Sequence, residues 1–549
     1  MQISRVNIYN KPFKAATVSI NALSDTHGEL LKANSAIETM RKHKDDFFCR
    51  EKKGSTNVTA ICGDWFMNGG KKGFVSNQSK PLAMFQLGIL NEFINQIKGM
   101  AGSVSTIFVP GNHEFDGGVE LLDNVLSNLD ADVVASNLDI EHSKGFSKTI
   151  ESGKLFSEKV IEAEDDKNPN LKHKILFLGI MPTNMQAYQK NLDGVALTDV
   201  NKKHLAKVEK EDYQNTLDIC KSKIEAFKKE NPNGIVIFMS HAGAGFSDYL
   251  AQEAPVNLIF DGHEHKTQIR TVNSTPIIPL SQNFRRIVNA KLSIDDNGNL
   301  KEIRTKITDP SDNKTRGPIL KLYRQLFKSD IVKKYSIKSN DKSISALKVD
   351  GVREGNSFLA NFITDSILSE LKKEDKDIDI FALNSSSIRH SLKVSNKKSV
   401  SNLDILNVLA GISEDSAKIY TNKVSGNELA YLVYDNLVFS RYNPDKRPII
   451  HYSGLIIDRT SIYKAIDEGK PLSEILQYIK DAKTNKPIEA DKTYKIANPE
   501  KYFLKSGNDK IKGMINSAEY TGFSVHELFQ RHFAENKNNI FVNCDNRII

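Results

Sequence analysis

The stretch IFVPGNHEFDGG, residues 107–118, places four chemically active side chains within five positions. They are Asn112, His113, Glu114 and Asp116. The glycines suit a turn, but a turn requires no imidazole beside an amide and two carboxylates. This density of ligand-type side chains predicts a functional site.

Similar side chains follow several other short apolar segments of the first 300 residues. Asp25 and His27 occur in SDTHG, Asp64 in GDW, His241 in SHAG, and His263 and His265 in GHEH. With His113, five of the 13 histidines of the chain lie at such positions. Their recurrence predicts one shared site rather than a set of unrelated turn residues.

Imidazoles, carboxylates and an amide oxygen, without a thiolate, suit a divalent ion of the Mn²⁺, Zn²⁺ or Fe²⁺ kind. Seven residues are candidate ligands, which is more than one tetrahedral site takes, so two ions are expected. Two neighbouring ions, one carboxylate bridging them, could clamp a phosphoryl group and activate a water molecule. The candidate ligands are Asp25, His27, Asp64, Asn112, His241, His263 and His265.

His113 is then an additional imidazole, next to a ligand and able to donate a hydrogen bond to phosphate. Asp116 follows three residues later and could fix the tautomer of His113 and stabilise its charged form. We therefore predict that His113 and Asp116 are catalytic. Glu114 and the glycines are expected to serve the turn and its packing.

Six apolar segments of strand length occur in this region, and five of them end in these residues. Amphipathic segments at 81–100 and 119–129 read as helices between them. Alternating strands and helices predict an α/β layered domain. Side chains at the carboxyl ends of strands in such domains face one crevice. The six segments are 16–25, 57–64, 105–112, 174–182, 234–241 and 256–263.

The series SDTHG, GDW, GNHEFD, SHAG and GHEH resembles the calcineurin-like metallophosphoesterase superfamily, and in particular its two-domain 5′-nucleotidase branch. The resemblance covers residues 16–305 and implies a four-layer α/β/β/α sandwich. It also implies that Asp25, His27, Asp64 and His265 hold one ion. The second ion would be held by Asp64, Asn112, His241 and His263, with Asp64 bridging and His113 and Asp116 as the catalytic pair.

The second half of the chain is similar to the C-terminal α/β substrate-binding domain of the same branch. Residues 1–15 are expected to be an N-terminal extension, 306–344 a linker with a helix, and 345–549 this second domain. The matching segments are REGNSFLANFITDSIL, DIDIFALNSSSIRHSL, VSGNEL, HYSGL and YFLKSGNDK. By position, the resemblance implies substrate contacts at Asn384, Arg389, Phe503, Asp509 and Arg353.

Three segments depart from the pattern of the family. Its usual triple glycine reads SSS at Ser385–Ser387, and its usual Pro-Phe, the second aromatic wall for a base, reads LAG at Leu409–Gly411. The usual GGD of its last loop reads GND at 507–509. Without the Pro-Phe, a base stacked on Phe503 would lack an aromatic side chain on its other face. The binding free energy lost would be roughly 1–3 kcal/mol, the usual contribution of stacking a base on an aromatic side chain.

Bulk composition is that of a globular protein, with 39% hydrophobic and 26% charged residues, and 549 residues should form at least two domains. The net charge of +8 is spread over 76 basic and 68 acidic residues, so no nucleic-acid partner is expected. No signal peptide and no apolar run of about 18 residues is visible, which predicts a cytoplasmic protein without a membrane partner. Export by an unrecognised route is the alternative.

The expected function is hydrolysis of phosphomonoesters, with nucleoside 5′-monophosphates as the main substrate class. Alternatives on the same plan are a 2′,3′-cyclic-nucleotide phosphodiesterase and a sugar-nucleotide hydrolase. A superfamily nuclease would need a basic groove. A binding protein that retains the metal site is the remaining alternative.

Overall fold

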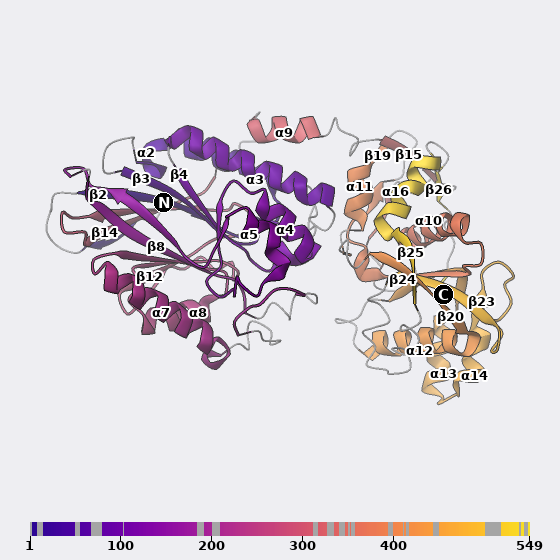
Figure 1. Ribbon diagram of the computed structural model, residues 1–549. Helices are drawn as coiled ribbons and strands as arrows, with labels where there is room; N and C mark the ends of the chain where they lie inside the picture. Colours follow the sequence, from indigo (N-terminus) through magenta and orange to yellow (C-terminus); the bar gives the residue numbers. More distant parts are fainter. Residues whose placement is uncertain are drawn as a thin grey trace. The chain divides into compact units, whose positions relative to one another are not determined.

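The protein is described by a computed structural model. The described residues are 3–7, 15–49, 55–66, 80–102, 104–168, 170–183, 192–199, 209–310, 317–326, 334–339, 346–349, 352, 357–393, 399–409, 411–412, 417–442, 449–499, 518–536, 540–542 and 547–548. The chain divides into two compact units, residues 1–326 and 327–549 (Figure 1).

The first unit contains two large sheets. The strands of the first are β1 (Ile3–Asn7), β2 (Ala16–Leu23), β3 (Ser55–Cys62), β4 (Val104–Val109), β5 (Asp132–Val134), β6 (Leu155–Phe156), β13 (Ile287–Ile294) and β14 (Leu300–Thr308), in the order β1-β14-β13-β2-β3-β4-β5-β6. Strands β2 to β6 run parallel, whereas β13, β14 and β1 pair antiparallel.

The second sheet has six strands. They are β7 (Lys159–Glu164), β8 (Lys172–Ile180), β9 (Ile235–Ser240), β10 (Leu258–Asp261), β11 (Arg270–Val272) and β12 (Thr275–Pro279), in the order β11-β12-β10-β9-β8-β7. Strands β8, β9, β10 and β12 are parallel. All six predicted strand segments are confirmed as strands, three in each sheet.

Helices cover the outer faces of both sheets (Figure 1). Along the first sheet lie α1 (Leu30–Lys42), α2 (Lys44–Phe47), α3 (Lys80–Ala101), η1 (His113–Gly117), α4 (Val119–Ser127), η2 (Lys144–Phe146) and α5 (Ser147–Glu151). Along the second lie η4 (Lys210–Tyr213), α7 (Gln214–Glu230) and α8 (Ala244–Glu253). Helix α9 (Pro318–Leu326) contacts α1 and α3. The result is the expected α/β/β/α sandwich.

The alternation of side chains along the strands explains this layering. In β2, Val18, Ile20 and Ala22 face the second sheet and pack with residues such as Phe177 and Met239 in one buried core. The other face of the second sheet packs against α7 and α8 in a separate core. Because both faces of these strands are covered, residues 175–180 of β8 and 235–239 of β9 are continuously apolar.

The second unit is built on a five-stranded sheet. Its strands are β17 (Ile380–Asn384), β20 (Lys418–Ser425), β21 (Ile450–Ser453), β24 (Thr493–Pro499) and β25 (Glu519–Ser524), in the order β21-β17-β24-β20-β25. Smaller pairings join β15 (Lys334–Ser339), β19 (Ser399–Ser401) and β26 (Ile540–Val542), β16 (Ala346–Leu347) with β18 (Leu392–Lys393), and β22 (Leu455–Ile457) with β23 (Ile479–Asp481).

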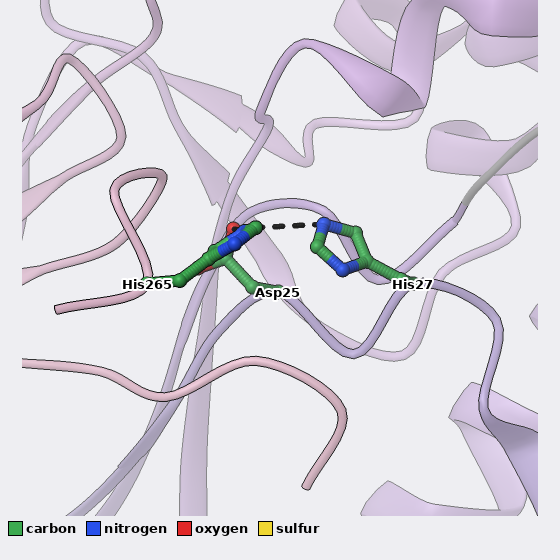
Figure 2. Close-up of side chains that lie close together, drawn as sticks. All are labelled: Asp25, His27 and His265. Carbon is green, nitrogen blue, oxygen red and sulfur yellow. Dashed lines mark hydrogen bonds and ion pairs between the residues drawn. The ribbon is translucent and has the colours of Figure 1, made fainter. Parts of the chain in front are cut away.

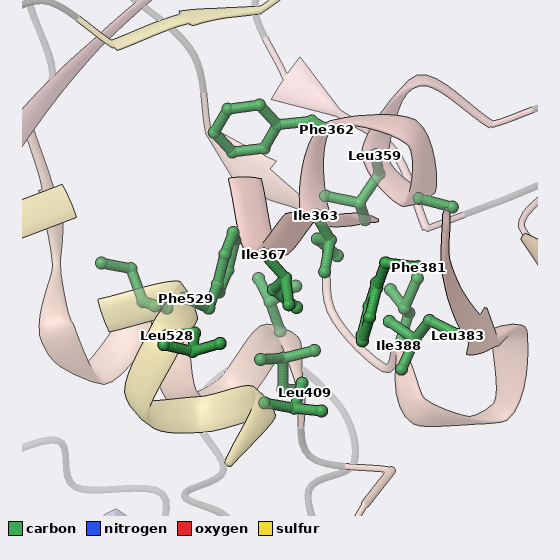
Figure 3. Packing of buried hydrophobic residues seen from close by; sticks show 14 of the residues in the cluster. Leu359, Phe362, Ile363, Ile367, Phe381, Leu383, Ile388, Leu409, Leu528 and Phe529 are labelled. Carbon is green, nitrogen blue, oxygen red and sulfur yellow. The ribbon is translucent and has the colours of Figure 1, made fainter. Parts of the chain in front are cut away.

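Helices flank this sheet on two sides, each with its own buried core. The helices are α10 (Phe358–Glu374), η6 (Ser385–Ser387), α11 (Asn402–Val408), α12 (Gly426–Tyr442), α13 (Arg459–Asp467), α14 (Leu472–Ile475), η7 (Leu476–Tyr478) and α16 (Val525–Asn536). Figure 3 shows one core, in which Ile363 and Ile367 of α10 lie between Leu528 and Phe529 of α16 on one side and Phe381 of β17 on the other.

Two features refine the expected organisation of the chain. Within the predicted N-terminal extension, Ile3–Asn7 forms β1, which pairs with β14 at the sheet edge. The two compact units give one boundary, after residue 326. The predicted bounds of the linker and of the second domain divide the chain further and stay predictions. No helix among the described residues has the length and apolar character needed to cross a membrane.

Candidate metal centre

The predicted ligands all follow strands that end at the same side of the sandwich. Asp25 and His27 follow β2, Asp64 follows β3, and Asn112 and His113 follow β4 of the first sheet; His241 follows β9, and His263 and His265 follow β10 of the second. Residues as far as 240 positions apart therefore meet, because two stacked sheets present the carboxyl ends of their parallel strands together.

Five of these residues have a left-handed backbone, which is uncommon outside glycine. The φ angles are 52° at Asp25, 51° at His27, 51° at Asp64, 74° at His263 and 55° at His265. The turns are held by backbone hydrogen bonds from Asp25 N to Gly63 O and from His27 N to Asp64 O. Such conformations concentrate at functional sites, where surrounding structure enforces them.

Asp25, His27 and His265 form one group with ligand atoms within 4.8 Å of one another. His27 and His265 point toward the Asp25 carboxylate (Figure 2). The Nε2 atom of His265 lies 3.1 Å from Asp25 Oδ1, and that of His27 lies 3.7 Å from the same oxygen. This is the set predicted for one ion, apart from Asp64.

Asp64, His241 and His263 form a second group within the same limit. His241 Nε2 lies 3.2 Å from Asp64 Oδ2, and the rings of His241 and His263 are 5.0 Å apart. His241 is oriented by its other nitrogen, Nδ1, which is 2.6 Å from Cys62 O. Asn112, the remaining predicted ligand of this ion, is buried directly before His113.

Asp64 also belongs to a third group, with His27 and His113. Its Oδ2 atom lies 3.5 Å from His27 Nε2, while its Oδ1 atom accepts a hydrogen bond from the backbone N–H of His113 at 2.9 Å. Asp64 is thus the carboxylate that lies between the two predicted ion positions.

His113 and Asp116 form the predicted pair. His113 Nδ1 and Asp116 Oδ2 are 2.8 Å apart, and the His113 ring packs edge-on against His27 with centroids 5.5 Å apart. The His113 side chain is 27% exposed, whereas that of His241 is fully buried. His113 is therefore at the accessible side of the cluster.

Neighbouring charges decide the protonation of the cluster. Burial lowers the pKa of His113, but the carboxylates of Asp116 and Asp64 outweigh it and raise that pKa to about 10. Burial raises the pKa of Asp64, yet His241 and His113 hold it well below its usual value. Burial is the main cause that lowers the pKa of His263 to about 4, and a neutral imidazole can offer a lone pair to a cation.

Glu114 was expected to serve the turn and its packing, and its hydrogen bonds also reach a second turn. Its buried carboxylate accepts hydrogen bonds from three backbone N–H groups, of Asp64 at 2.8 Å, Phe66 at 3.0 Å and Gly111 at 2.5 Å. Burial, followed by the nearby Asp64 charge, raises the pKa of Glu114 to about 7. Glu114 ties the turn after β3 to the turn after β4, while Asp64 makes the reverse link to His113.

The residues present fit divalent metal ions. Nitrogen and oxygen donors converge without a thiolate, and two ionised carboxylates supply the negative charge that a cation requires. The fit rests on the chemistry and spacing of the donors.

In the second unit, the structure describes Asn384 and Arg389. The Asn384 side-chain oxygen accepts a hydrogen bond from Ser386 N at 2.9 Å, which caps η6, and Arg389 N donates to Val408 O at 2.8 Å. Their predicted contacts with substrate stay predictions. Arg353, Phe503 and Asp509 lie outside the described residues.

Two of the three departures from the family pattern, SSS and LAG, touch each other. Gly411 N donates to Ser387 O at 3.0 Å, and a Cβ at Gly411 would collide with the carbonyl oxygen of Ser386. Ser385 and Ser387 are fully buried, so their side chains turn into the protein. The loop with the serines and the loop with Gly411 therefore contact each other. The sequence does not predict this contact, because Ser387 and Gly411 are well separated along the chain.

The fold and the site define a class, the metal-dependent phosphoric ester hydrolases. The model of the calcineurin-like phosphoesterases matches residues 18–267, and that of the 5′-nucleotidase C-terminal domain matches residues 336–515. The chain belongs to the two-domain 5′-nucleotidase family of the calcineurin-like metallophosphoesterases.

Solved structures of similar fold span both units. A 5′-nucleotidase precursor from Thermus thermophilus is 15% identical, with a TM-score of 0.54, over 97% of this chain and 99% of its own. A candidate 5′-nucleotidase from Staphylococcus aureus, in complex with alpha-ketoglutarate, is also 15% identical, with a TM-score of 0.52, over 96% and 98%. No curated protein sequence matches the chain. At this identity the structures establish the fold alone.

Proposed function

We propose that the protein hydrolyses phosphomonoesters, with nucleoside 5′-monophosphates as its main substrate class. The proposed centre holds two divalent ions of the Mn²⁺, Zn²⁺ or Fe²⁺ kind. Asp25, His27, Asp64 and His265 would hold the first; Asp64, Asn112, His241 and His263 would hold the second.

One observation carries the proposal. Asp64 belongs to the donor groups of both proposed ions. Its carboxylate oxygen Oδ2 lies 3.5 Å from His27 Nε2 and 3.2 Å from His241 Nε2. A carboxylate between two imidazole-bearing groups is the arrangement that a bridged pair of ions requires. Bound divalent ions would polarise the phosphoryl oxygens and lower the pKa of a water molecule.

The chain's own residues would supply a proton donor. Asp116 engages Nδ1 of His113, so Nε2 is the atom through which His113 would donate to a phosphoryl or leaving-group oxygen. Burial lowers the pKa of His113, but the Asp116 carboxylate beside Nδ1 raises it, which favours the protonated ring. His113 would thus stabilise the charge that develops in the transition state.

The proposed preference for nucleotides is supported by the second domain, which matches the model of the 5′-nucleotidase C-terminal domain. Arg389 would bind phosphate or carboxylate through its planar guanidinium group, and Asn384 would be a second polar contact. Arg353, Phe503 and Asp509 complete the proposed set, with Phe503 stacking on the base and Asp509 binding the ribose.

The test is phosphate release by the Mn²⁺-loaded protein, beside the variant His113→Asn. The panel holds AMP, GMP, UMP and p-nitrophenyl phosphate, with a 2′,3′-cyclic nucleotide and a UDP-sugar followed by coupled detection of their products. We expect nucleoside monophosphates to be preferred and His113→Asn to lower kcat roughly 100- to 10,000-fold, with Mn²⁺ binding retained.

A matched control is available in the same domain. His142 Nδ1 bonds Asp139, three residues earlier, at 2.7 Å, but the His142 side chain is 74% exposed. His142→Asn should leave turnover unchanged. Preference for the cyclic nucleotide or the UDP-sugar would shift the assignment to those alternatives. Bound metal without any hydrolysis would contradict the enzyme and favour a binding protein.

A further inference from the structure

We propose that Arg270 is a positioning residue of the metal centre. It would hold the turn that carries His263 and His265 against the helix that follows His241. The inference rests on the proposed metal centre. Arg270 is the first residue of β11, five positions beyond His265, and its side chain is 24% exposed.

The Arg270 guanidinium makes contacts in two directions. Its Nε donates to Asp248 Oδ1 at 2.6 Å, and one terminal nitrogen donates to Asp261 Oδ2 at 3.0 Å and to Ala244 O at 3.4 Å. Asp248 and Ala244 belong to α8, whereas Asp261 ends β10. One planar cation therefore joins a helix to the end of a strand.

Asp261 connects this contact to the predicted ligands. It is 4% exposed and lies two residues before His263. Its second oxygen, Oδ1, accepts a hydrogen bond from Ser247 Oγ of α8 at 2.8 Å. Both oxygens of a buried carboxylate are thus used to fix the end of β10 to α8.

Helix α8 is equally close to the other side of the centre. It begins at Ala244, three residues after His241. Gly262 N donates to Ser240 O at 2.9 Å, and Ala244 N donates to Glu264 Oε1 at 3.1 Å. These bonds hold the turn after β9 beside the turn after β10. The hydrogen bonds of Arg270 join the same strand end and helix.

Removal of the guanidinium would take away the donor that joins Asp261 Oδ2 to Asp248 and Ala244 of α8. A buried polar group that loses its hydrogen-bond donor is unfavourable, so the end of β10 should shift toward water or toward another donor. His263 would move with it, because the left-handed backbone at φ 74° depends on its surroundings. Partners that orient metal ligands influence metal affinity in this way.

The experiment uses full-length protein from which metal has been removed. Mn²⁺ affinity and stoichiometry are measured by isothermal titration calorimetry for the wild type, Arg270→Met and Arg270→Lys, together with the unfolding temperature. The control is Arg304→Met, because the side chain of Arg304 in β14 is 55% exposed and pairs with Glu302 at 2.7 Å, on a different sheet from Arg270. We expect Arg270→Met to weaken Mn²⁺ binding at one or both sites at least about 10-fold.

Arg270→Lys keeps the charge but cannot span Asp248 and Asp261, so an intermediate loss of affinity is expected. Should Arg270→Met fail to fold, Arg270→Lys decides the question. A lower unfolding temperature with wild-type Mn²⁺ affinity in the folded variants would overturn the inference, because it is the result of a purely structural role. A wild type that binds no Mn²⁺ would instead overturn the metal centre itself.

Discussion

Gly111 shows how tightly the residues of the candidate centre are fitted together. A Cβ at this position would collide with Asp64 Oδ1 and lie 2.6 Å from His241 Nε2. We predict that Gly111→Ala lowers kcat on p-nitrophenyl phosphate about 100-fold, because displacement of reacting groups by an ångström costs this much. Steady-state kinetics at saturating Mn²⁺ measure the effect.

Gly88→Ala is the control, because a Cβ at Gly88 in α3 meets nothing within 4 Å. This change should leave kcat unaltered and stabilise the fold by about 0.5–1 kcal/mol, the usual gain from Ala over Gly inside a helix. Equal activity of Gly111→Ala and Gly88→Ala would contradict the close packing of Asp64 and His241.

At the residue scale, the sequence predicted side chains that follow strands and missed those that support them. Asp25, Asp64 and His241 stand directly after apolar runs, so their position in the fold could be read from the sequence. Glu114 and Arg270 gave no comparable signal. The partners of Glu114 are backbone groups of the turns after β3 and β4, and those of Arg270 lie in α8 and at the end of β10. These groups become neighbours only when the strands pair and α8 packs on its sheet.

At the element scale, the sequence predicts the strands better than it predicts the turns that connect them. The strand segments were recognisable because buried parallel strands are continuous apolar runs. The left-handed turns after β2, β3 and β10 were not predicted, since they occur at Asp and His rather than at glycine. Tertiary hydrogen bonds such as that from Asp25 N to Gly63 O enforce them.

The packing of α10 against α16 gives a prediction at the same scale. Phe529 is fully buried and its ring lies 5.2 Å from Phe533 and 6.0 Å from Phe362 (Figure 3). Phe529→Ala should lower the free energy of unfolding of the second unit by about 3–5 kcal/mol. Urea unfolding followed by circular dichroism measures this loss.

Tyr442→Ala is the matched exposed change. Tyr442 ends α12 and is 65% exposed, so its removal should alter the free energy of unfolding by less than about 1 kcal/mol. A loss from Phe529→Ala no larger than that from Tyr442→Ala would mean that α10 and α16 do not share this core.

At the scale of the whole molecule, the sequence predicted two α/β domains and the sandwich of the first. It could not predict that α9 packs on α1 and α3, because an amphipathic helix shows that it has an apolar face but not what covers that face. The contact between the loops at Ser386 and Gly411 could not be predicted either. It connects the loop after β17 with the loop after α11, which become neighbours only in the folded domain.

Acid stability provides a prediction for the molecule as a whole. His451 and His526 are buried in the second unit, and burial, opposed only by single backbone hydrogen bonds, lowers the pKa of each to about 4. In the unfolded chain their pKa is near 6.5, so below that pH the unfolded state binds protons that the folded state does not. Stability is therefore complete above about pH 6.5 and falls as the pH drops toward 4.

Between pH 7 and pH 5 each of these histidines should lower the free energy of unfolding by about 2 kcal/mol. His526→Gln removes one titrating group, so the decrease in unfolding free energy over this interval should become smaller by that amount. Urea unfolding of both proteins at the two pH values measures the difference. Identical pH dependence would mean that His526 already takes up its proton in the folded protein, and hence that the α16 core admits water or a counter-charge beside it.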